Sequence, residues 1–325
     1  MRVGILGSTG QIGKAIAEHL ATRTAGRYTV RAAVRSGRKP AFSRGVETVV
    51  LDFSDPESFD ALLESVDHVV YAIGAPEQWV PDSAYFHRVN VTLLEAFLQR
   101  MLTHRGKSLT YISTFEVFSP LDGIVRESRP MAEKGATPYY QSMVDAYRMA
   151  RALSERHDFP VLFIHPAAVY GGLNTGMAIT DYLLNLKHGR FWRVPAVPAG
   201  AFPLVHVESL ADGIEKALSS GRFGESYLFA DVHVSLRELA EAAKAVERSA
   251  YRPIELPPAL IRPSVAMMEA VSRLTRRPPL ISAVQVKYIT QGIGMDCSKA
   301  IRELGWERLN LEQGVRRLFR GDNPA

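Results

Sequence analysis

The feature that most constrains the fold lies at the very start of the chain. A short apolar run, residues 2–7 (RVGILG), predicts a buried strand, and it leads directly into GSTGQIG and then into apolar residues at helical spacing. Glycine permits a tight turn and a close approach of the backbone to a ligand, while a helix N-terminus supplies N–H donors and a positive dipole. Strand, turn and helix together predict a cradle for a dinucleotide pyrophosphate, with a plain glycine turn as the alternative. The residues expected to line this cradle are Gly7, Ser8, Thr9, Gly10, Gln11, Ile12 and Gly13.

Strand and helix patterns then alternate through the front half of the chain. Strands interleaved with helices imply crossover connections and a parallel sheet that is covered on both faces. The sequence therefore predicts an α/β fold, a Rossmann-type doubly wound parallel sheet with a smaller, mostly helical C-terminal substrate lobe. The strand candidates are 2–7, 28–34, 47–51, 68–73, 108–113 and 160–165, and the helical patterns between them are 56–65, 84–104 and 138–157.

The pattern becomes irregular after Gly171. We expect a dinucleotide-binding core over residues 1–170 and a substrate-binding lobe over 171–325. Strands expected near 202–206 and 226–230 are candidates for returning to the core. Helices are expected in the lobe near 208–219, 235–247, 258–274, 282–290 and 311–319.

The end of the second strand indicates which dinucleotide is bound. An NAD site would place an acidic residue there for the ribose hydroxyls, but this chain has AAVRSGRK, with Arg35, Ser36 and Arg38. Arginine can grip a 2′-phosphate in a fork, whereas a carboxylate would repel it, so NADP is the predicted cofactor. Solvated loop charges are the alternative. Further cofactor contacts are expected after the third strand, at Asp52 and Phe53, and after the fourth, at Ala72, Ile73 and Gly74.

Composition excludes several other classes of function. The 325 residues carry a net charge of +5, but the basic residues are scattered, and no nucleic-acid-reading motif is present. No apolar run approaches the length of a membrane span, so neither nucleic acid nor membrane is expected as a partner. No metal-ligand spacing occurs, so no metal is expected. The single cysteine, Cys297, cannot form an internal disulfide, which makes the cytoplasm the expected compartment.

Several motifs in this order resemble the extended short-chain dehydrogenase/reductases, the NAD(P)-dependent epimerase/dehydratase family. The resemblance covers nearly the whole chain. It includes GSTGQIG, LDFSDPESF, VNVTLLEAF, YISTFEVF, PYYQSM, IHPAAVYGG, VHVESLADGI and DCSKAIRELGW. It implies a Ser/Thr–Tyr–Lys catalytic group, with Ser113 or Thr114 and Tyr139 as the first two members. It also implies cofactor contacts at Asn90, Met143, Pro166 and Val169, and a homodimer paired through helices like 84–104 and 138–157.

The family lysine is missing from its expected place, because Met143 stands there. Shifting the alignment to Tyr140 brings Val144 to that position, and the pair Tyr147 and Arg151 lies two turns further along the helix. Without a nearby cation, a tyrosine with a pKa of roughly 10 supplies little tyrosinate at neutral pH. A protonated Tyr139 is a poor base but a suitable acid, so reduction is the favoured direction. The alternative is that Tyr139 is only a packed helix residue.

The expected substrate is small and largely apolar. Relatives that act on nucleotide sugars carry Arg and Asp before a V-H-V segment, whereas this chain has Phe202 and Pro203. That difference removes a charge partner for a diphosphate. The aromatic residues could equally close the boundary between the lobes. The expected substrate contacts are Trp79, Phe115, Glu116, His165 and Phe202. For His165 the favoured alternative is that it only terminates its strand.

Three hypotheses of function follow from the sequence. The first is an NADP-dependent reductase of a small apolar carbonyl or enone. The second is an enzyme that uses the nicotinamide without net redox change, as an epimerase, a dehydratase or a rearrangement catalyst. The third is a catalytically silent NADP-binding sensor, which the missing lysine suggests.

Overall fold

The structure is a computed structural model of the 325-residue chain. It describes the chain except for residues 25, 38–39, 76–79, 81, 173–177, 191–195, 248–252, 276–278, 280–281 and 322–325. Two of the predicted site residues, Arg38 and Trp79, lie outside the described residues.

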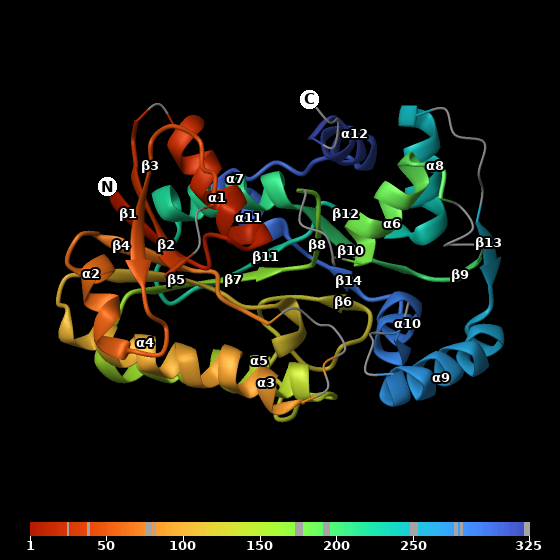
Figure 1. The fold of residues 1–325 in the computed structure, drawn as a ribbon, viewed down its shortest axis with the longest axis horizontal. Helices are drawn as coiled ribbons and strands as arrows, with labels where there is room; N and C mark the ends of the chain where they lie inside the picture. The colour runs from red at the N-terminus through yellow and green to blue at the C-terminus, as the bar shows by residue number, and fades with distance from the viewer. Residues whose placement is uncertain are drawn as a thin grey trace.

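A seven-stranded sheet forms the centre of the molecule (Figure 1). All its neighbouring strands are parallel, in the order β3-β2-β1-β4-β5-β7-β11. This arrangement confirms the predicted Rossmann-type α/β fold. The strands are β1 (Arg2–Leu6), β2 (Thr29–Arg35), β3 (Val46–Leu51), β4 (His68–Tyr71), β5 (Ser108–Ile112), β7 (Val161–Pro166) and β11 (Ser226–Phe229).

Helices cover both faces of this sheet. One layer, above the sheet in Figure 1, contains α1 (Gln11–Thr22), α7 (Val207–Ser220) and α11 (Ser298–Leu304). The other layer contains α2 (Asp60–Leu63), α4 (Leu93–Thr103) and α5 (Pro138–His157). The short α3 (Ala84–His87) leads into α4 through one π-helical turn, Arg88–Thr92. Because both faces are covered, the central strands β4 and β7 are buried along their whole length.

The second half of the chain builds a lobe of small sheets and helices. A three-stranded sheet joins β8 (Ala168–Tyr170), β10 (Ala201–His206) and β12 (Val232–Ser235). It packs with α6 (Ala178–Lys187), α8 (Leu236–Glu247) and α12 (Leu311–Gly321) around a second apolar core. Two strand pairs complete the lobe, β9 (Ala196–Pro198) with β13 (Ile254–Leu256) and β6 (Ile124–Val125) with β14 (Gly294–Met295). The remaining helices, α9 (Pro258–Thr275) and α10 (Ala283–Thr290), lie at the outer end of the lobe (Figure 1).

The two halves of the chain share the main sheet. Strand β11 pairs with β7 at one edge of that sheet, as anticipated for residues near 226–230. Strand β10 instead lies in the three-stranded sheet of the lobe, so the segment near 202–206 does not join the core sheet. The boundary after residue 170 stays a prediction, since β11, α7 and α11 all lie beyond it in sequence. Within the described residues, no helix combines the length and the apolar character that crossing a bilayer requires.

Candidate functional site

The turn after β1 is shaped by backbone contacts that only glycine allows. Gly7 has a φ of +80°, and a Cβ there would lie 2.5 Å from the carbonyl oxygen of Ala72. A Cβ on Gly13 would overlap the carbonyl oxygen of Gly7, because the first turn of α1 packs directly on the turn. The Gly10 N–H donates to the Gly7 carbonyl over 2.9 Å. The first turn of α1 therefore packs backbone against backbone on the turn after β1, with no space for a Cβ at Gly13.

The N-terminus of α1 is open to an anion. Its N-cap is Gly10, which offers no side-chain cap, and the first turn contains no acidic residue. Thr9 and Gly10 are exposed, and Gln11 and Ile12 are half-buried. The first N–H groups of a helix lack intrahelical acceptors, and the helix dipole favours negative charge there. This end of α1 therefore suits a pyrophosphate.

Two side chains fix the cradle to the rest of the sheet. The buried Ser8 hydroxyl donates to the Ala33 carbonyl of β2 over 2.6 Å. The Gln11 side-chain amide donates to the Gly171 carbonyl, which follows β8. Ser8 and Gln11 thus orient the cradle through their side chains, while the backbone of the turn remains available for a ligand.

The carboxyl end of β2 carries an exposed cation. Arg35 is the last residue of the strand, and it makes no ion pair with any residue that the structure describes. Ser36 beside it is also exposed, and Gly37 turns the chain with a φ of +77°. At the end of β3, the Asp52 carboxylate accepts hydrogen bonds from the Ser54 hydroxyl and the Ser54 N–H, which lower its pKa.

The segment after β4 connects the cradle to α5. Ala72 contacts Gly7, and two residues further on Gly74 is exposed. The Ala75 N–H donates to the side-chain oxygen of the buried Asn90 over 2.7 Å, and the Asn90 amide donates to the Ser142 hydroxyl over 2.9 Å. Predicted as a cofactor contact, Asn90 is placed here as a bridge between β4 and α5.

Tyr139 lies in the first turn of α5. The helix begins at Pro138 behind the N-cap Thr137, whose hydroxyl accepts the Tyr140 N–H. The Ser142 hydroxyl donates to the Tyr139 carbonyl over 2.7 Å, so the bridge through Asn90 ends at this residue. The half-buried Tyr139 ring packs edge-on against Phe86 of α3, with 5.6 Å between ring centroids.

Met143 follows Tyr139 one turn later and is buried against the main core, with 6% of its surface exposed. Where the family lysine would bring a charge, the structure therefore has an apolar contact. Any cation that acts on Tyr139 must come from elsewhere.

Ser113 and Thr114 follow β5 and differ in what their hydroxyls contact. The Thr114 hydroxyl donates to the buried Glu116 carboxylate over 2.8 Å and accepts the Glu116 N–H. The Ser113 hydroxyl is buried near the Tyr111 hydroxyl. Because the Thr114 hydroxyl donates its proton to Glu116, it has none left for a second hydrogen bond.

His165 lies inside the protein near the end of β7, which matches the alternative that it terminates its strand. It is fully buried, with Nδ1 3.0 Å from the Thr114 carbonyl and Nε2 3.1 Å from the Ser226 hydroxyl. Burial lowers the pKa of His165 to about 3. The Tyr147 hydroxyl lies 3.1 Å from the same Ser226 oxygen. His165 thus connects the segment after β5 with the first residue of β11, Ser226, and it does so as a neutral imidazole.

The predicted aromatic substrate contacts lie at the boundary between core and lobe. Phe115 and Phe202 are each 1% exposed. Both rings pack against Tyr288 of α10, with centroid distances of 6.1 Å and 5.7 Å. This placement matches the alternative that aromatic residues close the lobe boundary. Of the other predicted contacts, Glu116 and Pro166 are buried and Val169 is half-buried.

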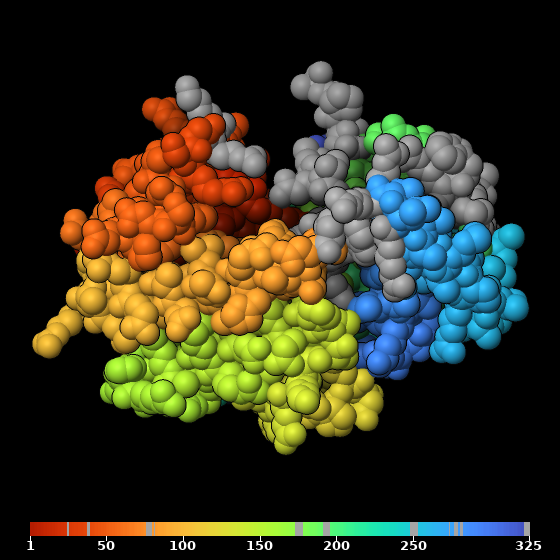
Figure 2. Space-filling model, turned by 60° about the horizontal axis from the view of Figure 1, so that its bottom comes forward, coloured from red at the N-terminus to blue at the C-terminus, as the bar shows by residue number. Residues whose placement is uncertain are grey.

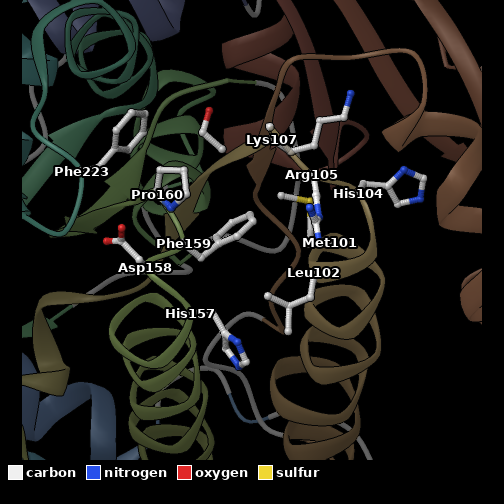
Figure 3. A pocket seen from close by; sticks show the side chains of 12 residues that line it. Met101, Leu102, His104, Arg105, Lys107, His157, Asp158, Phe159, Pro160 and Phe223 are labelled. Atoms are coloured by element: carbon white, nitrogen blue, oxygen red, sulfur yellow. The ribbon is translucent and has the colours of Figure 1, made fainter.

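A separate pocket lies at the amino ends of the strands, on the side of the sheet away from the cradle. Figure 3 shows this pocket of about 760 Å³, where α4 and α5 end near the starts of β5 and β7. Arg105, Lys107 and His157 line it together with Phe159 and Phe223. Ligands of open α/β sheets bind outside the carboxyl ends of the strands, so this pocket is not assigned to the cofactor. Within the described residues, no group of acidic, His and Cys side chains could hold a metal ion.

Two hydrogen-bonded links between these positions were not predicted from the sequence. Ser142 connects Asn90 to the Tyr139 carbonyl, and Gln11 connects the cradle to the segment after β8. The serine of the PYYQSM motif was a signal for the first link. Nothing local in the sequence signals the second, which joins residues 160 positions apart.

Comparison with known proteins gives one family and many related folds. Residues 3–230 match the sequence model of the NAD dependent epimerase/dehydratase family. No curated protein matches the sequence.

Solved structures resemble the chain over almost its whole length. The crystal structure of gox2253 has a TM-score of 0.80 at 21% identity, and the match covers 99% of this chain and 97% of that chain. The dTDP-glucose 4,6-dehydratase of Bacillus anthracis, in complex with NAD, gives 0.74 at 17% identity, covering 99% and 96%. The UDP-glucuronic acid 4-epimerase of Bacillus cereus, also in complex with NAD, gives 0.74 at 16% identity, covering 99% and 98%. At these identities the likeness shows the shared fold.

Proposed function

The chain belongs to the NAD dependent epimerase/dehydratase family, and on that premise we propose that it is an NADP(H)-dependent reductase of a small, largely apolar carbonyl or enone. The observation that carries this proposal is an intact cradle beside a tyrosine whose basic partner is replaced by a buried methionine. The intact cradle favours a bound dinucleotide. The replacement of the lysine by Met143 favours proton donation by Tyr139 over proton removal.

The cradle fits a dinucleotide because its glycines permit the tight turn that leaves the start of α1 open. A side chain at Gly7 or Gly13 would strike backbone atoms, and the open helix end offers donors to a pyrophosphate. The preference for NADP rests on Arg35, an exposed cation with no ion pair among the described residues, at the strand end where NAD sites carry a carboxylate. A 2′-phosphate would give that guanidinium a bidentate partner.

When bound, the reduced nicotinamide supplies the hydride. Tyr139 donates its hydroxyl proton to the substrate oxygen, and the Ser113 hydroxyl hydrogen-bonds the same oxygen. Asn90 and Ser142 hold the first turn of α5 against the segment after β4, which fixes the position of Tyr139. The buried Met143 adds no positive charge at the place of the family lysine, and an unperturbed phenol is protonated at neutral pH.

Replacement of the phenol tests this function. In steady-state assays of NADPH oxidation with a panel of aldehydes, ketones and enones, Tyr139→Phe should lower kcat by about 100-fold or more. Tyr140→Phe, which alters the adjacent ring, is the matched control and should change kcat by less than about threefold. Equal turnover by Tyr139→Phe and the wild type would remove Tyr139 from the mechanism.

A redox-neutral reaction is the second candidate, and the buried Glu116 favours it. Its carboxylate lies on the turn after β5 and accepts a hydrogen bond from the Thr114 hydroxyl. Such a group can move a proton in an epimerisation or elimination while the cofactor is retained. Product that forms without net loss of NADPH absorbance, in an amount exceeding the enzyme, would support this candidate over the reductase.

The proposed assembly is a homodimer that pairs through α4 and α5. The groove between these two helices is lined by the half-buried Leu102 and Met149, with Glu95, Gln99 and Arg156 around them. Burial of Leu102 and Met149 against a second copy would remove apolar surface from water. Light scattering should give twice the chain mass for the wild type and the single-chain mass for Met149→Glu.

A further inference from the structure

Helix α9 carries an apolar surface on its outer side. Four large side chains on it are strongly exposed: Leu260 by 65%, Met267 by 65%, Val271 by 53% and Leu274 by 87%. Their spacing along the helix brings all four to one face. Large exposed apolar patches on a folded protein mark a surface that contacts something else.

The packing of α9 against the rest of the lobe does not involve this outer face. Helix α9 is held by its opposite side, where Ile261 and Val265 pack with Val286 of α10 in a small apolar cluster of their own. The helix lies at the outer end of the lobe, in light blue at the right of Figures 1 and 2. The outer stripe therefore has no packing partner in the part of the chain that the structure describes.

The charge of this segment is strongly positive. Residues 258–277 contain four arginines and one glutamate, a net charge of +3 in a chain whose total is +5. Arg262, near the start of α9, is exposed to solvent. The one acidic group is turned inward, since the Glu269 carboxylate accepts the Ala283 N–H at the start of α10 over 2.8 Å. No acidic side chain among the described residues of α9 thus opposes an anionic partner on the outer side.

We propose that α9 docks on the surface of an anionic lipid bilayer. A helix with an exposed apolar face in a basic segment can lie in the plane of the bilayer, with the apolar face below the headgroups. Anionic headgroups attract the basic segment, as they do other polybasic stretches. The proposal departs from the expectation of no membrane partner, which rested on the lack of a spanning segment and did not address contact with a membrane surface.

A second copy of the chain fits this face less well. A symmetric dimer would bring the same surface of both chains together, and with it two segments that each carry a charge of +3. Like charges at such a contact repel, and the inward-turned Glu269 leaves the described part of α9 without an acid to compensate them. An anionic bilayer would bury the apolar stripe among its acyl chains and attract the positive charge of the segment through its headgroups.

Docking through α9 would bring the candidate site close to lipid. Helix α10, which packs under α9, carries Tyr288, and the ring of Tyr288 contacts Phe115 on the turn after Ser113. The Tyr288 hydroxyl donates to the Pro203 carbonyl of β10 over 3.3 Å. These contacts link the docked helix to the turn that follows Ser113.

Flotation of the purified full chain with lipid vesicles tests the docking without any substrate. Vesicles of phosphatidylcholine and phosphatidylglycerol in a two-to-one ratio should bind the wild type, and vesicles of phosphatidylcholine alone should bind it at least about tenfold more weakly. High salt should release the protein from the anionic vesicles. The double variant Met267→Glu/Leu274→Glu should lose at least about tenfold in binding.

The control is Phe223→Glu, which adds one negative charge, half the change of the double variant, at a side chain that is 52% exposed and lies outside α9. It should bind anionic vesicles like the wild type. All variants should bind NADPH equally, which separates a failure of docking from a failure of the proposed function or of folding. Equal vesicle binding by the double variant and the wild type, or no vesicle binding by either, would overturn the proposal. A double variant that changes only the mass in light scattering would assign the face to a second copy and also overturn it.

Discussion

The two halves of the candidate site are built by different means. On the cradle side, between β1, β4 and α1, geometry is fixed by backbone against backbone at Gly7 and Gly13. On the catalytic side, from β5 to α5, it is fixed by side-chain hydrogen bonds through Asn90, Ser142 and His165. A backbone contact admits no side chain at all, whereas a side-chain network can lose one member and keep its shape. This difference explains how the chain can carry Met143 in place of a lysine and still hold Tyr139 in position.

The largest expected effect is on the cradle side. In Gly13→Ala the new methyl would overlap the Gly7 carbonyl, and a backbone atom cannot move aside cheaply. We expect unfolding to become easier by about 3 kcal/mol and cofactor affinity to fall by about 100-fold or more. Denaturant unfolding and calorimetry measure the two effects.

Gly10→Ala is the control for that substitution. A Cβ on Gly10 would lie 3.2 Å from the Gly7 carbonyl oxygen, a tight contact that a small shift relieves. Its effects should be clearly smaller than those of Gly13→Ala. Equal effects of the two variants would mean that backbone contact does not define the cradle.

The second prediction concerns the hydrogen-bond network and its dependence on pH. Burial lowers the pKa of His165 to about 3, while an unfolded histidine titrates near 6.5. Between these values the unfolded chain binds the proton and the folded chain does not. The stability that neutral His165 supports is therefore complete above about pH 6.5 and is lost as the pH falls towards 3. From pH 7 to pH 5 this loss should be about 2 kcal/mol.

His165→Gln isolates that contribution. The variant should be less stable than the wild type at pH 7, but its loss of stability between pH 7 and pH 5 should be smaller by about 2 kcal/mol. Urea unfolding at the two pH values measures the difference. The same pH dependence in both proteins would show that His165 is not held neutral by the fold.

The third prediction concerns the bridge between the two sides. Asn90→Ala removes the acceptor of the Ala75 N–H and the donor to Ser142. We expect kcat to fall by about tenfold, with a smaller change in the affinity for NADPH, because the cradle keeps its backbone contacts. A loss of cofactor affinity as large as the loss of kcat would mean that the two sides are not separately built.

How much the sequence could predict follows the same division. The strand, turn and helix around Gly7 were predictable because their signals are local and lie within a few residues. The burial of His165 and Phe202 was not predictable, because β7 is covered on both faces and Phe202 of β10 packs against Tyr288 of α10. Which of these side chains a helix covers depends on segments far away in the sequence. The apolar face of α9 was hidden for a related reason, since helical spacing is the same whether a face is buried or exposed.

The central claim is that an intact NADP cradle stands beside a tyrosine without its lysine, and cofactor titration tests its first half most directly. Calorimetry with NADPH and NADH should be run on the wild type, on Arg35→Ala and on the control Arg316→Ala, which alters an exposed arginine of α12. The account predicts that the wild type binds NADPH at least about tenfold more tightly than NADH, and that Arg35→Ala alone loses this preference. Equal binding of the two cofactors by the wild type, or binding of neither, would contradict it.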